Sequence, residues 1–179
     1  RKTVWNSYTP EDKQQLQQVS DGYRDFLDRG KTERECVSQI IAMAEAAGYQ
    51  DLEQLVKSGK QLQPGAKVYA VCMKKAIALF HLGTAPLEQG MAILGAHIDS
   101  PRLDIKQNPL YEDTELVYLD THYYGGVKKY QWVTIPLAIH GVVAKKDGSV
   151  VEINIGDHDD DPIFCITDLL IHLAAEQQE

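Results

Sequence analysis

The sequence predicts an α/β protein in which N-terminal helices pack on a mixed sheet and a β-rich segment follows. Apolar residues recur at helical spacing through the first third of the chain, and short β-type runs begin after Pro64. The run at 91–94 is apolar at every position. These observations indicate a first domain over residues 1–105 and the start of a second, β-rich domain over residues 106–179.

Capping residues mark the expected helices. Thr9 before Pro10 begins the first helix, because a threonine hydroxyl accepts from an unpaired backbone N–H and proline suits the first helical position. Thr32 begins the second helix, which should end at Gly48. A short third helix is expected over residues 51–58.

Strands are expected beyond Pro64. The β-type ranges are 68–72, 76–80, 103–105, 116–119 and 163–165, with a hairpin formed by 133–144 and 149–155. The run at 91–94 fits a central strand covered on both faces, because none of its positions is polar. A further helix is expected from about Thr167.

Charge and cysteine content exclude several classes of protein. The 179 residues carry a net charge of -8, which argues against non-specific binding to nucleic acids or anionic membranes, since both need a basic surface. No apolar run approaches the roughly 20 residues that span a bilayer, and no signal peptide is recognisable. Cys36, Cys72 and Cys165 are odd in number and far apart, so we expect buried, reduced thiols in a cytoplasmic protein.

The segment after the apolar run holds the most informative residues, His97 and Asp99. Ligands of α/β sheets collect outside the carboxyl ends of strands, so a histidine at this position faces a candidate site. Its imidazole suits zinc, and Asp99 can accept the other ring N–H and so select the tautomer. The alternative is a locally hydrogen-bonded histidine with Asp99 capping the next turn, and the spacing of a lone His-x-Asp pattern by itself favours this alternative.

Three other segments carry candidate residues. His158-Asp159-Asp160 has the same spacing, but its acidic flanks favour a mobile solvated loop over a calcium or magnesium site. Thr121-His122-Tyr123-Tyr124-Gly125-Gly126 allows close backbone approach at its glycines, and its aromatic side chains suit a pocket or a subunit contact. A tight turn beside edge strands is the alternative, and the spacing does not fit a phosphate loop. His172 lies in an apolar helical pattern, which by itself indicates a core or interface residue.

Several motifs together resemble those of the aspartyl aminopeptidase family, the dinuclear zinc aminopeptidases of the vacuolar aminopeptidase type. Residues 95–103 are similar to the family segment (S/A)-H-x-D-S-P-x-L. The similarity continues, in the same order, through Tyr124-Gly125-Gly126 with Trp132, residues 137–143 and residues 162–173.

This resemblance implies a zinc-dependent aminopeptidase that releases N-terminal residues from peptides by metal-activated water. His97 would be a ligand of one zinc ion, and Asp99 would orient it. His172 matches a histidine that reaches from the dimerisation domain into the neighbouring subunit's active site, which replaces the core interpretation given above. Residues 1–105 would then begin the catalytic domain, residues 106–179 would begin the inserted dimerisation domain, and the protein would be a homo-oligomer.

Two departures from the family pattern qualify this interpretation. The family's remaining zinc ligands and catalytic glutamate lie beyond residue 179, so we expect this chain alone to be an inactive, metal-free fragment. Residues 131–135 differ from the family's W-F-D-R-D, which leaves the preferred N-terminal residue open. The alternative function is a non-catalytic assembly or peptide-binding domain that keeps the peptidase fold.

Overall fold

The computed structural model describes residues 3–177, and its contacts divide the chain into two compact units, Arg1–Ile98 and Asp99–Glu179. The division between units falls a few residues before the domain boundary that the sequence predicts at 105/106. The assignment of those domains to catalytic and dimerisation roles stays a prediction.

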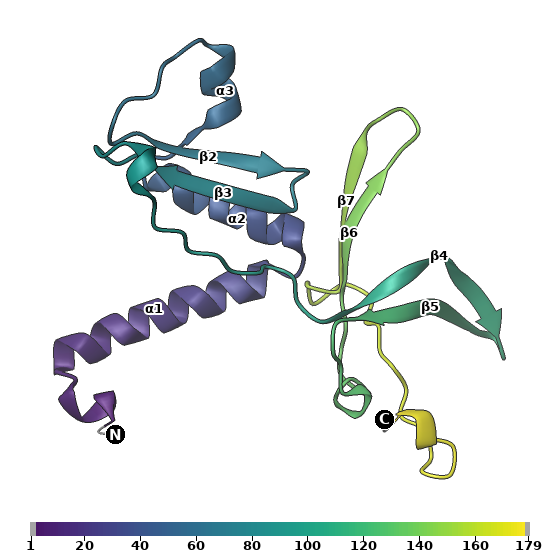
Figure 1. Ribbon diagram of the computed structural model, residues 1–179. Helices are drawn as coiled ribbons and strands as arrows, with labels where there is room; N and C mark the ends of the chain where they lie inside the picture. The colour runs from purple at the N-terminus through teal and green to yellow at the C-terminus, as the bar shows by residue number, and fades with distance from the viewer. Residues whose placement is uncertain (1–2, 178–179) are drawn as a thin grey trace. The chain divides into compact units, whose positions relative to one another are not determined.

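The first unit is a mixed α/β structure. Its elements are a 3-10 turn (Val4–Ser7), α1 (Pro10–Arg29), α2 (Glu33–Ala46), β1 (Gln50–Asp51), α3 (Leu52–Lys57), β2 (Lys67–Cys72), β3 (Ala76–His81) and a second 3-10 turn (Leu87–Gln89) (Figure 1). The strand order is β1-β2-β3, with β1 parallel and β3 antiparallel to β2. The expected helices, the expected strand pair and the mixed sheet are confirmed.

Both long helices begin with the residues that the sequence indicates. At α1, the backbone N–H of Asp12 donates to the hydroxyl of Thr9 (3.1 Å) and the backbone N–H of Thr9 donates to the Asp12 carboxylate (2.9 Å). Thr32 and Glu35 form the same reciprocal capping box at α2. Gly48 follows the end of α2 with a φ of +86°, a conformation that favours glycine.

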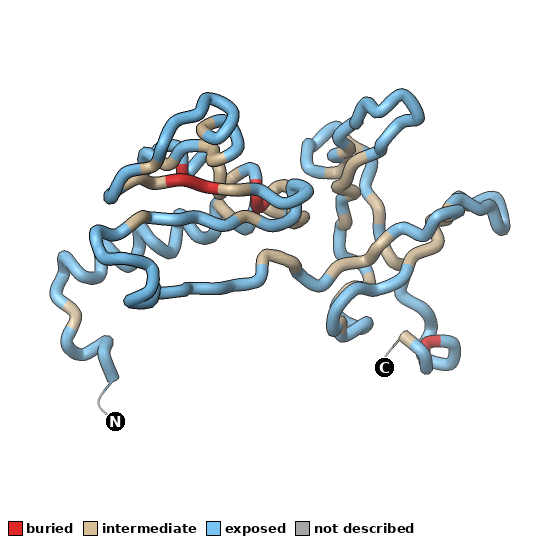
Figure 2. The backbone as a smooth tube through the Cα atoms, turned by 45° about the horizontal axis from the view of Figure 1, so that its top comes forward, coloured by how far each residue is buried: buried red, intermediate tan, exposed pale blue. Residues whose placement is uncertain are grey.

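The core of the first unit lies between α2 and the sheet. Its buried side chains are Cys36, Val37 and Ala44 of α2 with Val68 and Tyr69 of β2. Figure 2 shows the buried segments on these two elements. The Tyr69 hydroxyl donates to Glu45 (2.8 Å), so the polar end of this buried ring has a partner. Burial of the apolar face of α2 therefore holds this unit together.

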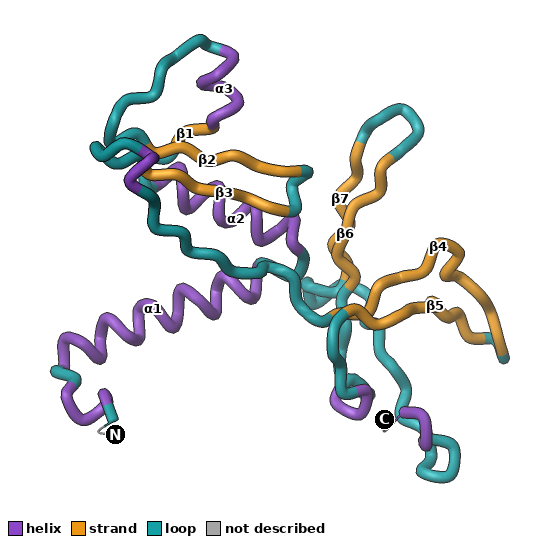
Figure 3. Tube along the Cα trace, viewed as in Figure 1, coloured by secondary structure: helices purple, strands orange, loops and turns teal. Residues whose placement is uncertain are grey.

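The predicted central strand at 91–94 is wrong for this structure. Residues 90–101 are loop throughout (Figure 3), and the side chains of Ile93 and Leu94 are 79% and 99% exposed. A strand needs neighbours that pair with its backbone N–H and C=O groups. No strand within residues 3–177 pairs with this run, so its apolar pattern alone does not make it a strand.

The second unit consists of two hairpins and irregular segments. Its elements are β4 (Arg102–Asp113), β5 (Leu116–Tyr124), a 3-10 turn (Lys129–Gln131), β6 (Ile139–Ala144), β7 (Val150–Ile155) and a last 3-10 turn (Ala175–Gln177). β4 pairs with β5 and β6 with β7, both antiparallel, and the β4–β5 register shifts between Ile105 and Leu110. The second hairpin is confirmed but begins at Ile139. The residues before it make only isolated bridges, Val133 with Ile166 and Leu137 with Phe164.

The helix expected from Thr167 is wrong, as is the short strand at 163–165. The only helical turn in residues 167–177 is the 3-10 turn Ala175–Gln177. Leu170 and Ile171 are both 75% exposed. Helix formation is costly to nucleate and depends on burial of the apolar face, and within residues 167–177 only Ala174 is buried.

The prediction that all three cysteines are buried is confirmed for Cys36 and wrong for Cys72 and Cys165. Cys36 is buried and packs in the core, whereas Cys72 and Cys165 are exposed, and none of the three is in a disulfide. Burial raises the pKa of the Cys36 thiol, so this side chain behaves as a small core residue.

No helix in residues 3–177 combines the length and the apolar character that membrane spanning requires. α1 has 20 residues, but charged and amide side chains are spread along it. The cytoplasmic location stays a prediction.

Candidate active site

His97 lies at the end of the loop that completes the first unit. Its side chain is exposed, so the ring is accessible to a ligand rather than packed into a core. The strand that was expected to lead into it is a loop here, so the placement of His97 at the carboxyl end of a strand is not found. Its role as a metal ligand stays a prediction.

Asp99 opens the second unit and is held by a residue far away in the sequence. The hydroxyl of Tyr124, the last residue of β5, donates to Oδ2 of Asp99 at 2.8 Å. The sequence pattern indicated Tyr124 as part of a pocket, a subunit contact or a tight turn, and gave no link to Asp99. The signal that could have linked the two residues was the pairing of the strand that follows Asp99 with the strand that ends at Tyr124.

Charged side chains surround this contact on the same end of the β4–β5 hairpin. The guanidinium of Arg102 lies 4.0 Å from the centre of the Tyr124 ring, and its Nε donates to Oδ1 of Asp104 at 2.7 Å. His122 extends the cluster, with its Nε2 3.8 Å from Oδ2 of Asp104. Strand register explains the arrangement, because Arg102 pairs with Tyr124 and Asp104 pairs with His122.

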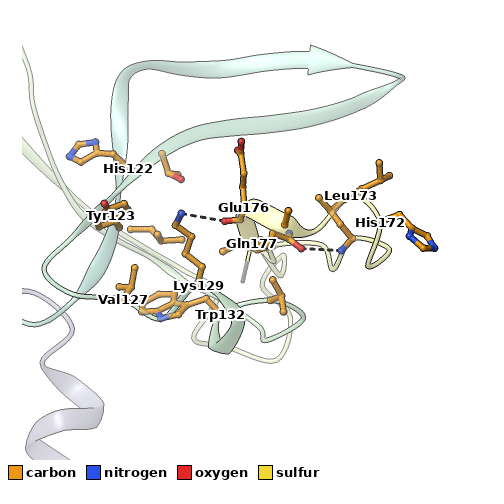
Figure 4. Close-up of a pocket in the computed structure, with 15 residues that line it drawn as sticks. His122, Tyr123, Val127, Lys129, Trp132, His172, Leu173, Glu176 and Gln177 are labelled. Atoms are coloured by element: carbon orange, nitrogen blue, oxygen red, sulfur yellow. Dashed lines mark hydrogen bonds between the residues drawn. The ribbon is translucent and has the colours of Figure 1, made fainter. Parts of the chain in front are cut away.

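A pocket of 690 Å³ lies in the second unit, and His172 is one of its lining residues. Figure 4 shows His122 and His172 on opposite sides of this pocket, with Lys129 and Glu176 between them. The ammonium of Lys129 donates to the carbonyl oxygen of Glu176 (3.3 Å), which ties the C-terminal 3-10 turn to the segment after β5 (Figure 4). The pocket is lined mainly by apolar side chains, which suits a ligand or protein segment with an apolar part.

The residues present fit part of a zinc site. An exposed imidazole is a suitable ligand, and a carboxylate two residues later is a suitable partner for its second nitrogen. Protein zinc sites take three or four protein ligands. Residues 3–177 contain no group of three or more histidine, cysteine or acidic side chains placed to hold a metal. His97 is therefore at most one member of a set completed elsewhere.

The second His-x-Asp segment has a structural explanation. Oδ2 of Asp161 accepts from the backbone N–H groups of Gly156 (2.9 Å) and His158 (3.1 Å), which closes the acidic loop. These two bonds hold the pKa of Asp161 below its usual value. His140 of β6 contacts Oδ1 of Asp157 through Nε2 (3.2 Å). The loop thus carries its own hydrogen bonds, which favours the turn interpretation over a calcium or magnesium site.

Comparison with known proteins identifies the family. The profile described as "Aminopeptidase I zinc metalloprotease (M18)" matches residues 26–179. This chain belongs to the M18 aminopeptidase family. The resemblance found in the sequence motifs is thereby confirmed.

Relatives and solved structures of the M18 family extend this match to nearly the whole chain. The chain is 52% identical over 178 residues to a probable M18 family aminopeptidase 1 of Clostridium acetobutylicum, covering 99% of this chain and 38% of that protein. It superimposes on aminopeptidase I of Borrelia burgdorferi with a TM-score of 0.87 and 41% identity, covering 95% of this chain and 41% of that one. For the Thermotoga maritima enzyme of the family the TM-score is 0.85 and the identity 44%, covering 98% and 37%. The α/β fold is confirmed, and the chain spans about two fifths of the length of these relatives.

Proposed function

We propose that this chain is part of a zinc-dependent aminopeptidase that releases N-terminal residues from peptides. The observation that carries the proposal is the M18 family match, which includes the His97-x-Asp99 segment. Two structural features support it. The His97 ring is accessible, and the Asp99 carboxylate is held by a hydrogen bond from Tyr124.

In this proposal each site residue has a separate role. His97 supplies one ligand to zinc, and Asp99 orients its ring, because a carboxylate that accepts the second ring N–H fixes the tautomer and raises ligand basicity. The remaining ligands and the general base come from outside residues 1–179. His172 acts from the second unit in the active site of a neighbouring subunit, which makes the protein a homo-oligomer.

Substitution of His97 tests the metal role. In the full-length protein we expect His97→Ala to abolish peptide hydrolysis and to lower the zinc content measured by elemental analysis, because a ligand is lost. His81→Ala is the matched control, since His81 is an exposed histidine in β3 and should leave both quantities unchanged. Unchanged turnover and zinc content in His97→Ala would defeat the assignment and favour a non-catalytic assembly or peptide-binding domain.

Substitution of His172 tests action across subunits. We expect His172→Ala to lower kcat with little loss of zinc, whereas His158→Ala, in the exposed acidic loop, should change neither. Mixed oligomers of the His97→Ala and His172→Ala variants sharpen the test. If His172 acts in trans, sites that combine an intact His97 with an intact His172 from the neighbour form and activity returns. Mixed oligomers as inactive as the parent variants would show that His172 acts within its own subunit or not at all.

The isolated chain provides an independent test of the incomplete ligand set. Because residues 3–177 offer no group of three metal-binding side chains, we expect calorimetric titration of the 179-residue chain with zinc to show no tight stoichiometric binding. A tight, one-to-one isotherm would contradict the division of the zinc site between this chain and residues outside it.

A further inference from the structure

We propose that Tyr124 is a positioning residue that sets the orientation of the Asp99 carboxylate. The Arg102 guanidinium, which lies over the tyrosine ring, holds the ring in place. The inference rests on the proposed function, in which Asp99 orients the zinc ligand His97. It assigns a role to the Tyr124-Gly125-Gly126 motif, whose sequence is equally compatible with a pocket, a subunit contact and a turn.

A long-range hydrogen bond joins the two residues directly. The Tyr124 hydroxyl donates to Oδ2 of Asp99 at 2.8 Å, although the two residues are 25 positions apart in the sequence. A bond from a neutral hydroxyl to a carboxylate is charge-assisted and stronger than one between neutral groups. One carboxylate oxygen is thereby directed toward β5, which restricts rotation of the Asp99 side chain.

The Tyr124 ring is itself held in place. The Arg102 guanidinium lies 4.0 Å from the ring centre, within the range of a cation–π interaction. Arg102 is in turn fixed by Asp104, whose Oδ1 lies 2.7 Å from Nε, and their side chains are only 27% and 32% exposed. Partial burial weakens the screening of this ion pair by solvent, so Arg102 provides a defined support for the ring.

The backbone next to Tyr124 allows the close approach. Gly125 has a φ of +74°, and a Cβ built on it would lie 3.5 Å from Cα of Pro101. A side chain at this position would be strained by the backbone conformation. Gly125 therefore lets the chain turn directly beside Pro101, while the pairing of Tyr124 with Arg102 sets the height of the tyrosine along the hairpin. The Asp99-Ser100-Pro101 segment and the Tyr124-Gly125 segment therefore pack directly against each other.

These contacts give the cluster a function that a turn alone would not have. A carboxylate that orients a metal-binding histidine works only if its own plane is fixed, and groups that fix it are part of the supporting structure of a metal site. The Tyr124 hydroxyl fixes the plane of the Asp99 carboxylate and does not need to contact substrate to do so. The expected effect is moderate, because Tyr124 is 39% exposed and water can compete for the bond.

Substitution of Tyr124 in the full-length protein tests the inference. Tyr124→Phe removes the hydroxyl and keeps the ring under Arg102. We expect zinc affinity, measured by competition with a chromophoric chelator, to weaken about threefold to tenfold, less than the full value of a charge-assisted bond because water can partly replace the hydroxyl. A similar fall in kcat with an unchanged KM should accompany it. Tyr118→Phe is the matched control, since Tyr118 lies in the same strand and stacks on Tyr111 at 5.2 Å. It should behave as the wild type.

Asp99→Asn separates this inference from the proposed function. If Asp99 orients His97, this variant should weaken zinc affinity about tenfold to a hundredfold. Asp99→Ala removes the acceptor altogether, so adding Tyr124→Phe to Asp99→Ala should change nothing further. No effect of Asp99→Asn on zinc affinity would overturn the role proposed for Asp99. If Asp99→Asn has a clear effect but Tyr124→Phe behaves like Tyr118→Phe, only the role of Tyr124 is overturned. A full Tyr124→Phe effect in the Asp99→Ala background would also overturn it.

Arg102→Gln provides a second variant in case Tyr124→Phe lowers the yield of folded protein. It removes the charge over the ring and leaves the hydroxyl in place, so we expect about a twofold loss of zinc affinity in the same direction. Circular dichroism of the metal-free protein checks that the fold persists. A folded Arg102→Gln variant with wild-type zinc affinity would contradict the support assigned to Arg102.

Discussion

The two units of this chain reach regular structure by different means. The first unit buries side chains from α2 and β2 against each other, with Val37 only 1% and Val68 only 2% exposed. In the second unit, among the described residues, only Ala174 is buried, although its two hairpins are paired along their strands. In this molecule, strands can therefore be fully paired through their backbones without forming a buried apolar core.

The difference shows what each unit depends on. Hydrophobic burial is the dominant stabilising contribution in folded proteins, and an isolated two-stranded hairpin is marginally stable in water. Among the described residues the second unit buries little apolar surface, and partly exposed ion pairs such as Arg102 with Asp104 add little stability, so an apolar surface from outside the unit would stabilise it. A homo-oligomer of the kind proposed above would supply such a surface, and the exposed apolar residues near His172 are available to meet it.

The largest expected effect comes from the same substitution made in a strand of each unit. Val68→Ala should lower the free energy of unfolding of the first unit by about 2 kcal/mol, because it removes fully buried methyl groups and leaves a cavity. Val150→Ala, at a 57% exposed position of β7, should cost less than about 0.5 kcal/mol. Urea denaturation, monitored by amide hydrogen exchange in each unit, measures the loss of unfolding free energy at both positions. Equal losses at the two positions would mean that the second unit has a core that the structure does not show.

A smaller effect is expected at the base of the second hairpin. Gly156 has a φ of +111°, and a Cβ built on it would lie 2.9 Å from Cα of Ala138. Gly156→Ala should therefore destabilise the hairpin by about 1 to 2 kcal/mol through backbone strain and a contact with main-chain atoms. Gly141→Ala is the control, since nothing lies within 4 Å of its Cβ position. Hydrogen exchange of β6 and β7 should speed up in the first variant and stay constant in the second, and the reverse order would refute the explanation.

The smallest expected effects are changes in the stability of each unit with pH. The hydrogen bond to Glu45, together with burial, raises the pKa of Tyr69 to about 12. A raised pKa gives stability that is complete below the unfolded value of 10.0 and is lost as pH rises toward 12, so the first unit should loosen in alkali. The pKa of Asp161 is lowered by its bonds from Gly156 and His158, so its contribution is present above 3.8 and is lost as pH falls below that value. Tyr69→Phe should remove the alkaline response of the first unit, and Asp161→Asn should reduce the acid response of the second unit, in which hydrogen bonds from Ser149 also lower the pKa of Asp147. Hydrogen exchange or near-ultraviolet circular dichroism follows both responses. A first unit that responds to acid alone would contradict this division.

Local signals in the sequence predicted the elements whose causes are local. Thr9 and Thr32 cap their helices through residues three positions away, and Gly48 ends α2 through its own backbone conformation. The paired strands β2 and β3 are joined by a turn of a few residues, so their register is also local. Residue identity and close neighbours therefore suffice to predict α1, α2 and the pairing of β2 with β3.

The candidate site was predictable only in part. The order of the family motifs indicated His97, Asp99 and His172 as candidate site residues, whereas the spacing of His97 and Asp99 alone did not identify a metal ligand. The contact of Tyr124 with Asp99 depends on the register of β4 against β5, including the shift after Ile105, and no spacing rule contains that information.

The sequence alone predicted the family, the caps of α1 and α2 and the β6–β7 hairpin apart from its start, since each follows from residue identity and nearby neighbours. The tertiary structure decided where apolar patterns become core. Residues 91–94 and the segment after Thr167 have the composition of buried elements, yet both are exposed and irregular here. An apolar pattern indicates only that a segment has a surface suited to burial. Whether that segment forms a strand or a helix depends on the partner surface that covers it.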